Sequence, residues 1–298
     1  MPNKNSRGQT YAEKASFANV LCTTSSAAGV IGTSLEPIFD SDHSSVVFSS
    51  NVSDDITYTA AAGTFTFARA GIYHIVLAAH TQQETAHRLQ TFAMKLNSAS
   101  AFYTGLKQVN TGFDPVESTH QAVVSIAAAD VLHIRMLTAG NTATIIQGTS
   151  VIITEITSGH YASHQATADG SNTNIDEFNP FDTNYTNNPA SYTTVTAGMT
   201  VTATDGSFTI NSAGRYLVMV TNLFVMADQS GGTSVITMKL KKGGTAFATR
   251  VVTAIATDDP AENTFCLIED LAAGDIMTAT WDTNDATAGD GVRAQKGT

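Results

Sequence analysis

Residues 63–77 read Gly63-Thr-Phe-Thr-Phe-Ala-Arg-Ala-Gly-Ile-Tyr-His-Ile-Val-Leu77, and residues 206–220 read Gly206-Ser-Phe-Thr-Ile-Asn-Ser-Ala-Gly-Arg-Tyr-Leu-Val-Met-Val220. Each stretch has a short alternating segment, a turn closed by Ala-Gly and a longer apolar segment, which is the pattern of two β-strands joined by a turn. The two copies lie 143 residues apart. This repetition predicts one β-domain that is used twice in the chain.

Further anchors keep the same order through both halves of the chain. The matching segments are Met94-Lys-Leu96 with Met238-Lys-Leu240, Ala101-Phe102 with Ala246-Phe247, and Ala127-Ala-Ala-Asp130 with Leu271-Ala-Ala-Gly-Asp275. A chain of 298 residues is long enough for two domains of about 150 residues, each with its own core. We therefore predict an N-terminal arm over residues 1–15, a first domain over 16–158 and a second over 159–298. The polar arm is either an unstructured terminus or a segment that becomes ordered on a neighbouring subunit.

Strand candidates recur with turn residues between them in both halves. In the first domain the predicted strands are Ser16–Thr24, Ser45–Asn51, Ile56–Ala60, Thr64–Ala68, Gly71–His80, Arg88–Leu96, Ala101–Gln108, Gln121–Ile126, Val131–Leu137 and Ser150–Thr157. In the second they are Met199–Thr204, Ser207–Asn211, Gly214–Met226 and Thr233–Lys241, and residues 160–167 are either junction or first strand. This spacing predicts an all-β fold of two tandem jelly-roll β-sandwich domains.

The strand predicted over Gly71–His80 is largely apolar on both of its faces. We expect one face to pack into the core of its own domain, and the other to be covered by a second subunit. The strand predicted from Gly214 has the same character. The predicted subunit interface comprises Tyr73, His74, Ile75, Val76, Tyr216, Val218 and Val220.

Composition argues against several classes of partner. Charged residues make up 14% of the chain and the net charge is −11, with no basic stripe, so we expect no nucleic-acid partner. Cys22 and Cys266 do not occupy matching places in the two halves, so we expect two free, buried thiols and folding in a reducing cytoplasm. We also expect neither a signal peptide in residues 1–15 nor a membrane span, because apolar runs of the required kind are missing.

No histidine pair predicts a metal site. His160 and His164 are four residues apart, but they lie in a predicted loop or strand and no Glu or Cys completes a zinc site. His74 and His80 share one strand face about 20 Å apart, which is too far to hold one ion. Packed or interface histidines, with titration near neutrality, are the expectation for these two.

Acidic and nucleophilic residues give no clear active site either. The acidic segments 40–42, 54–55, 258–259 and 282–285 lack the glycine and terminal glutamate of an EF-hand loop, and we interpret them as solvated turns. A carboxylate pair for glycoside hydrolysis stays open, because its geometry is three-dimensional. There is no nucleophile elbow and no phosphate loop. We predict no catalytic residue, no metal, no cofactor and no enzymatic activity.

The repeated motif resembles the globular heads of the tumour necrosis factor and complement superfamily. The resemblance is carried by Gly63, Phe65, Gly71 and Tyr73, and again by Gly206, Phe208, Gly214 and Tyr216. The turns at Asp130 and Asp275 resemble the Gly-Asp turn of that family, and Ser150–Ile156 is similar to its final strand. The resemblance implies a ten-stranded jelly roll of two sheets, usually assembled as a trimer. It also implies that the final strand lies between the first strand and the one that begins at Tyr73.

The two halves differ where that final strand is expected. Gln147-Gly-Thr149 leads into Ser150–Ile156, whereas the matching Lys296-Gly-Thr298 stands at the end of the sequence. We therefore predict that the second domain lacks its own last strand. An unfilled position inside a sheet leaves backbone N–H and C=O groups without partners. We expect either another segment to fill it by β-augmentation, such as residues 1–15 of a neighbour, or a longer native chain.

These features together predict a non-enzymatic structural protein of a bacteriophage virion, assembled in the host cytoplasm. The specific expectation is a homotrimeric capsid decoration or cement protein that binds the major capsid protein or other virion proteins. The alternative is a tail-fibre or host-attachment protein that binds surface glycans. Membrane and nucleic-acid partners are not expected, and a secreted signalling ligand is disfavoured.

Overall fold

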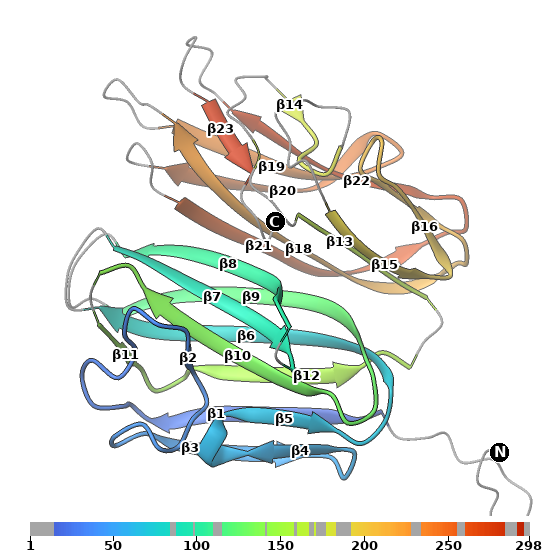
Figure 1. Ribbon diagram of the computed structural model, residues 1–298. Helices are drawn as coiled ribbons and strands as arrows, with labels where there is room; N and C mark the ends of the chain where they lie inside the picture. Colours follow the sequence, from blue (N-terminus) through green and yellow to red (C-terminus); the bar gives the residue numbers. More distant parts are fainter. Residues whose placement is uncertain are drawn as a thin grey trace, which may run out of the picture.

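The computed structural model describes residues 15–83, 88–97, 99–109, 115–140, 142–157, 160–166, 170, 177–182, 192–227, 234–254, 260–283 and 291–294. Most of the predicted arm, residues 1–14, lies outside this part, and so does the predicted domain boundary between residues 158 and 159. Strands dominate the described residues, which confirms the all-β class. Two β-sandwiches lie one above the other, domain 1 below and domain 2 above (Figure 1).

Domain 1 is a sandwich of two antiparallel sheets. In the first sheet the strand order is β3-β1-β12-β6-β9, with β11 at the end of β6. Its strands are β1 (Phe17–Thr24), β3 (Val47–Val52), β6 (Gly71–Gln83), β9 (Pro115–Ile126), β11 (Ala143–Ile145) and β12 (Ser150–Glu155). The final strand, β12, therefore lies between β1 and β6, as the resemblance implied.

The second sheet of domain 1 has the order β4-β5-β10-β7-β8, with β2 beside β10. Its strands are β2 (Glu36–Pro37), β4 (Ile56–Thr59), β5 (Thr64–Phe67), β7 (Arg88–Leu96), β8 (Ala101–Val109) and β10 (Val131–Thr138). One short 3-10 helix, η1 (Ala60–Ala62), precedes β5. Apart from the short β2 and β11, each sheet has five strands, which together make the ten-stranded jelly roll that the resemblance implied.

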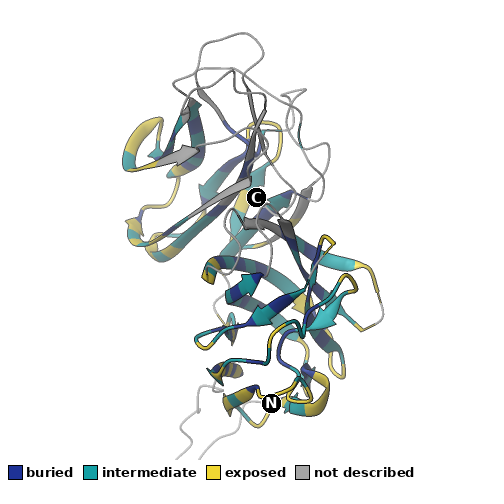
Figure 2. Ribbon diagram, turned by 90° about the vertical axis from the view of Figure 1, so that its left-hand side faces the viewer, coloured by how far each residue is buried: buried dark blue, intermediate teal, exposed yellow. Residues whose placement is uncertain are grey.

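The core of domain 1 is one continuous cluster between the two sheets. Along β6 the side chains alternate, and Tyr73, Ile75 and Leu77 are fully buried. The Tyr73 ring meets the Phe67 ring edge to face at 4.7 Å between centroids, which joins β6 to β5. Figure 2 shows buried residues along the strands and exposed residues gathered in the turns.

Domain 2 repeats most of this arrangement. One sheet has the order β16-β17-β22-β19-β20 with β14 beside β22, a second has the order β21-β18-β23, and β13 pairs with β15 alone. The strands are β13 (Tyr161–Ala166), β14 (Glu177–Phe178), β15 (Tyr192–Ala197), β16 (Met199–Thr202), β17 (Ser207–Ile210), β18 (Gly214–Ala227), β19 (Ser234–Lys242), β20 (Thr245–Ala254), β21 (Pro260–Leu271), β22 (Ile276–Thr283) and β23 (Gly291–Ala294).

The first position of each repeated motif requires glycine because of its backbone φ angle and its close neighbours. Gly63 and Gly206 have φ angles of +60° and +61°, in the left-handed region that favours glycine. A Cβ on Gly206 would lie 2.6 Å from Nδ2 of Asn179 and 2.7 Å from the carbonyl carbon of Phe181. A Cβ on Gly63 would lie 2.9 Å from the carbonyl carbon of Phe39. The turn before the alternating strand therefore demands glycine in both domains.

The second glycine of each motif lies beside the tyrosine two residues later. A Cβ on Gly71 would lie 3.1 Å from Cε2 of Tyr73. The Tyr73 hydroxyl donates a hydrogen bond to the carbonyl oxygen of Arg69 at 3.3 Å, and the Tyr216 hydroxyl donates to that of Ser212 at 2.6 Å. The spacing Gly-x-Tyr recurs because the same ring closes the same turn in both domains.

The aspartate turns are also equivalent. Asp130 Oδ2 accepts a hydrogen bond from the backbone N–H of Ala127, and Asp275 Oδ2 accepts one from that of Ala272, both at 2.8 Å. Asn97 donates a further hydrogen bond to Asp130 at 2.7 Å. Hydrogen bonding by Asn97, and then by the Ala127 N–H, lowers the pKa of Asp130 below its usual value.

Some strands differ from the predicted set. β9 begins at Pro115 rather than at Gln121, and β15 and β21 were not predicted at all. Their sequences are rich in Thr, Ser and acidic residues and show little hydrophobic alternation. Such segments become strands because a long neighbour offers them a full ladder of backbone partners, as β18 does for β21 from Gly214 to Val225. Tertiary context decides these elements.

We predict that Gly206→Ala destabilises domain 2 more than Gly243→Ala does. Both residues have positive φ, which costs alanine about 1–2 kcal/mol, but a Cβ at Gly243 meets nothing within 4 Å. Trp281 is fully buried in domain 2 and is the only tryptophan of the chain, so its fluorescence during urea denaturation reports on this domain. Equal losses in the two variants would show that the contacts around Gly206 relax without cost.

Candidate functional site

The sheet of domain 2 is interrupted at the position that β12 fills in domain 1. β18 pairs with β21 along one side from Gly214 to Val225, and on its other side β23 pairs only with residues 224–227. Among the described residues, no strand pairs with β18 on that second side between Gly214 and Leu223. β13, the counterpart of β1, likewise has β15 as its only strand partner in the described part. We call the position between β18 and β13 the strand slot.

Domain 1 shows which side chains belong in such a position. Val151 of β12 lies opposite Leu77 and Ile153 lies opposite Ile75, and all four side chains are fully buried. Complete burial of a valine or isoleucine side chain is worth about 1.5–3 kcal/mol. These two side chains of β12 therefore contribute substantially to the closure of domain 1.

A cavity of about 580 Å³ occupies the strand slot and the space beside it. One wall is β18, including Tyr216, Val218 and Val220, and another is β13 from Tyr161 to Gln165. The opposite sheet forms an apolar floor that includes Phe208, Ile210, Leu240, Met277 and Ala279. A cavity of this volume, with an apolar floor and strand edges on two sides, is suited to an extended peptide.

The core of domain 2 is divided where the cavity lies. Among the described residues, one cluster surrounds Phe224 and Trp281, and a separate one joins Ile210, Leu271 and Met277. The equivalent residues of domain 1 form one cluster that includes Val151 and Ile153. In the described part, the partly buried Phe247 packs against both clusters, but no inward pair of side chains like Val151 and Ile153 joins them into one.

Domain 1 faces the cavity from outside. β9 contributes Gln121 and Val123 to the lining, and β6 contributes His74. Gln121 Nε2 donates a hydrogen bond of 2.7 Å to Thr221 Oγ1, which joins β9 to β18. Burial lowers the pKa of His74, and the imidazole lies 3.4 Å from Gln121 Oε1. The outer side of the strand slot is therefore more polar than its floor.

His164 of β13 packs inward at the edge of the strand slot. Its ring meets Phe181 and Phe208 at centroid distances of 6.1 and 6.4 Å, and Nδ1 lies 2.7 Å from Thr194 Oγ1. Burial is the main cause that lowers the pKa of His164, so the neutral imidazole is favoured in the folded protein. His160, four residues earlier, is exposed.

The residues of the predicted subunit interface fall into three groups. Tyr73 and Ile75 are fully buried in the core of domain 1, so those two side chains have no surface left for another subunit. His74 and Val76 lie on the opposite face of β6. The other three, Tyr216, Val218 and Val220, line the cavity together. A subunit contact through these last five residues stays a prediction.

The β13 and β22 residues of the lining were not predicted as site residues. Their sequences carry no motif for a peptide groove, and His164 was considered only as a metal ligand. The signal that could have led to them is the alignment of the two halves, because it placed a missing strand next to the first strand of domain 2.

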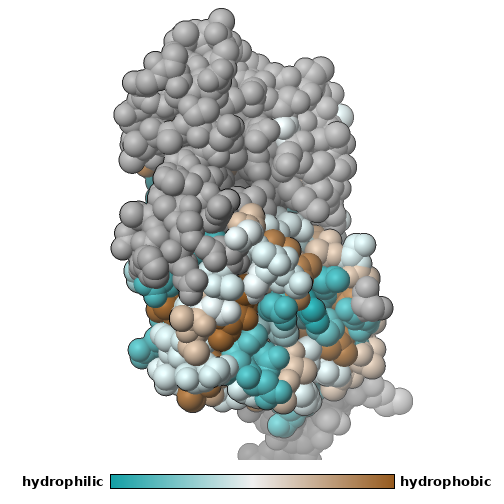
Figure 3. All heavy atoms as spheres, turned by 60° about the vertical axis from the view of Figure 1, so that its left-hand side comes forward, coloured by the Kyte–Doolittle hydropathy of each residue, from teal (hydrophilic) through white to brown (hydrophobic). Residues whose placement is uncertain are grey.

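Both domains expose hydrophobic side chains on the side of the β6 or β18 sheet that points away from the core. We call this side the outer face. In domain 1, Phe17, Leu21 and Ile152 are 40, 40 and 47% exposed, and in domain 2 Leu217 lies directly opposite Ile268, at 58 and 67% exposed. On the side of domain 1 seen in Figure 3, hydrophobic residues are interspersed with hydrophilic ones.

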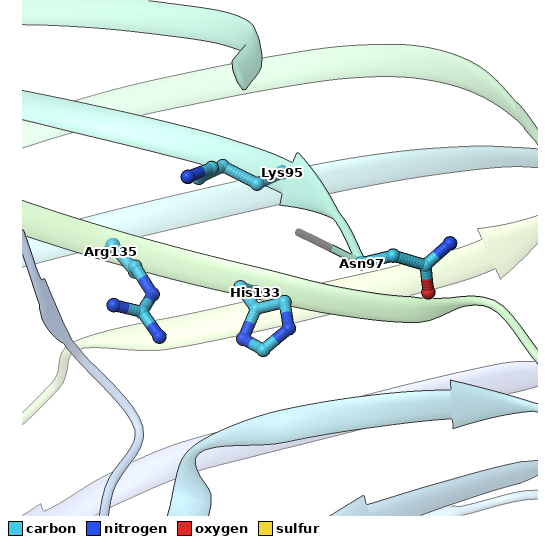
Figure 4. Close-up of a pocket in the computed structure, with 4 residues that line it drawn as sticks. All are labelled: Lys95, Asn97, His133 and Arg135. Atoms are coloured by element: carbon cyan, nitrogen blue, oxygen red, sulfur yellow. The ribbon is translucent and has the colours of Figure 1, made fainter. Parts of the chain in front are cut away.

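A second, shallower hollow of about 310 Å³ lies on the outside of the other sheet of domain 1. It is lined by Lys95, Asn97, His133 and Arg135, which Figure 4 shows on neighbouring strands. Burial lowers the pKa of His133, and the positive charges of Arg135 and Lys95 add to this effect. Arg135 also donates a hydrogen bond of 3.0 Å to the carbonyl oxygen of Leu35. The chemistry of this hollow suits a small anion.

The cysteines agree only partly with expectation. Both are free thiols, and Cys22 is buried, but Cys266 is exposed. Cys266 lies opposite Met219, on the outer face of β21, which is a surface in this structure. Among the residues that the structure describes, no group of three or more His, Cys, Asp or Glu could hold a metal ion. The same part of the chain contains no helix with the length and apolar character for a membrane span.

Comparisons with known proteins give a fold likeness only. No protein-family profile and no curated protein matches the sequence. Among solved structures, murine APRIL is 8% identical with a TM-score of 0.32, covering 48% of this chain and 100% of that one. Eiger TNF from S. frugiperda is 10% identical with a TM-score of 0.34, covering 50% and 97%. At these values the likeness carries no functional argument, and the strand order of domain 1 identifies the jelly roll.

We predict that Ile153→Ala destabilises domain 1 by about 2–5 kcal/mol, because it empties a packed site in the core. The transition reported by Trp281 in domain 2 should change little. Hydrogen exchange of β6 peptides, followed by mass spectrometry across a urea series, measures the first domain. The neighbouring Ile152→Ala, at a side chain that is 47% exposed, should destabilise domain 1 clearly less. Equal effects of the two variants would contradict the assigned register.

We also predict that His164 makes domain 2 less stable in acid. Its folded-state pKa lies below that of the unfolded chain, so the unfolded chain takes up the proton first as the pH falls below about 6.5. The free energy of unfolding should therefore fall through that range and level off below the folded-state pKa. His164→Gln should reduce this dependence in urea titrations followed by Trp281, and an unchanged dependence would contradict the prediction.

Proposed function

We propose that this protein is a non-enzymatic structural protein of a bacteriophage virion, and specifically a homotrimeric decoration protein of the capsid. The observation that carries the proposal is the hydrophobic outer face of both domains. Phe17 and Leu21 of β1 flank Ile152 of β12 on one sheet surface, and Leu217 and Ile268 form a direct pair in domain 2. Contiguous exposed hydrophobic surface marks a site of protein association more often than a catalytic site.

The outer face lies where subunits of this fold would meet. It belongs to the sheet that contains β12 and β6 in domain 1 and β18 in domain 2, and Val76 of the predicted interface lies on it, whereas His74 on the same face of β6 is directed toward domain 2. In a trimer these side chains would be buried, and the remaining surface would be free to bind the capsid shell. The virion setting rests on the sequence profile, with its low charge, two free thiols and tandem β-domains.

The expected behaviour of the purified chain is a single trimeric species in sedimentation equilibrium. Ile152→Asp should shift that species toward monomer, since a carboxylate would be buried in the interface. Val251→Asp is the matched control, because Val251 is 58% exposed but lies on β20 in the opposite sheet. A chain that is monomeric throughout, or equal behaviour of both variants, would refute the assembly through the outer face.

The virion role has its own test. Electron microscopy of particles made without this protein should show bare positions on the shell, and such particles should lose resistance to heat. Particles with an unchanged surface and unchanged heat stability would exclude decoration. Binding to surface glycans on an array, together with a location on the tail, would favour the alternative host-attachment role.

A further inference from the structure

Domain 1 provides a filled copy of the strand slot. β12 runs antiparallel to both β6 and β1. It is hydrogen-bonded on both sides at its end: the N–H of Ile156 donates to the carbonyl oxygen of Ile72, and the N–H of Glu155 donates to that of Ser16, each at 2.8 Å. An interior strand of this kind pairs its backbone in both directions. The strand slot has the same two borders, β18 and β13.

β18 directs backbone groups at the strand slot. In β6, the carbonyl oxygens of Ile72 and His80 accept hydrogen bonds from the segments on the β12 side, so alternate residues of β6 turn their backbone toward β12. The corresponding residues of β18 are Arg215, Leu217 and Met219. Their N–H and C=O groups have no strand partner on this side in the described part of the chain. They form a ready template for an added strand.

The inward side chains of β18 show which side chains an added strand needs. Val218 and Val220 correspond to Ile75 and Leu77, which are fully buried because Val151 and Ile153 cover them. In domain 2 both valines remain partly exposed and line the cavity. An added strand therefore needs aliphatic side chains at two alternate positions, and polar side chains between them would face His74 and Gln121 of domain 1.

We propose that the strand slot binds an extended segment of another protein, which inserts as an antiparallel strand between β18 and β13. Its two alternate aliphatic side chains pack over Val218 and Val220 and join the two halves of the core. Residues 1–14 of a second copy do not meet this requirement, because no two aliphatic residues stand two positions apart in them. The proposed occupant is a different polypeptide with this alternation of aliphatic side chains. This binding site does not depend on trimerisation or on a virion location.

The test uses a synthetic peptide with the sequence of residues 149–156, Thr-Ser-Val-Ile-Ile-Thr-Glu-Ile, flanked by lysines for solubility. The full chain is refolded from urea with and without the peptide. Because β9 of domain 1 borders the cavity, refolding lets the peptide enter the strand slot before the two domains close around it. We expect the peptide to slow hydrogen exchange at the amides of Leu217 and Met219. It should also raise the urea midpoint reported by Trp281, because it binds only folded domain 2.

Matched peptides test the register without any change to the protein. Aspartate in place of the residues that correspond to Val151 and Ile153 should weaken binding by about tenfold or more, since both side chains face the floor. Serine in place of the residues that correspond to Ile152 and Thr154, which point outward, should have little effect. Equal binding of the two peptides, or no binding by the unmodified one, would overturn the proposal.

Two results with the chain alone would also overturn it. Slow exchange at Leu217 and Met219 without peptide, independent of protein concentration, would mean that the chain fills the strand slot itself. Slow exchange that increases with protein concentration would mean that a second copy supplies the strand. A trimer that binds the peptide would support both the trimeric assembly and the strand slot. A monomer that binds it would support the strand slot and refute the trimeric assembly.

Discussion

A strand inside a β-sheet has to satisfy the backbone groups of two neighbours, and in domain 1 this task falls on β12. Its backbone joins β6 to β1, and its inward side chains, Val151 and Ile153, complete a continuous core. Glu155 at its end accepts hydrogen bonds from Arg69 and from the N–H of Ser16, which fixes the start of β1 and the turn before β6. The order of the whole sheet thus depends on one six-residue strand.

Among its described residues, domain 2 has the same architecture without that strand. Its motif glycines, its Tyr216 hydrogen bond and its aspartate turn are preserved, so the local structure of the turns does not need the missing strand. The effects are confined to the sheet beside β18, where the core is divided and Val218 and Val220 remain partly exposed. Contact with domain 1, including the Gln121–Thr221 hydrogen bond, lies across the outer side of this region.

The repeated motif made the fold predictable, because each of its residues has a local physical role. Gly63 and Gly206 need a positive φ. Tyr73 and Tyr216 each close a turn over the glycine two residues earlier, so these positions are alike in both domains. The polar part of β9, and β15 and β21 as a whole, could not be predicted, since their strand structure comes from neighbours distant in sequence. The same limit applies to the site.

The predicted interface residues illustrate this limit further. Tyr216, Val218 and Val220 were predicted as a subunit interface, and alternation alone could not tell a subunit contact from the wall of a cavity. The floor of that cavity comes from β17, β19 and β22, and no local pattern shows that these strands enclose a cavity together with β18. Cys266 was expected to be buried because free cysteines usually are. Its strand was not predicted, so the face on which the thiol lies could not be assigned from the sequence.

Covalent duplication with one unequal strand has a consequence for symmetry. A ring of identical jelly rolls offers the same edge at every position, whereas the described part of this chain contains one closed unit and one open unit. Three such chains around an axis would present six similar domains but only three-fold symmetry. Any ligand of the open unit would then bind once per chain, so the duplication would set a stoichiometry of one ligand for every two domains.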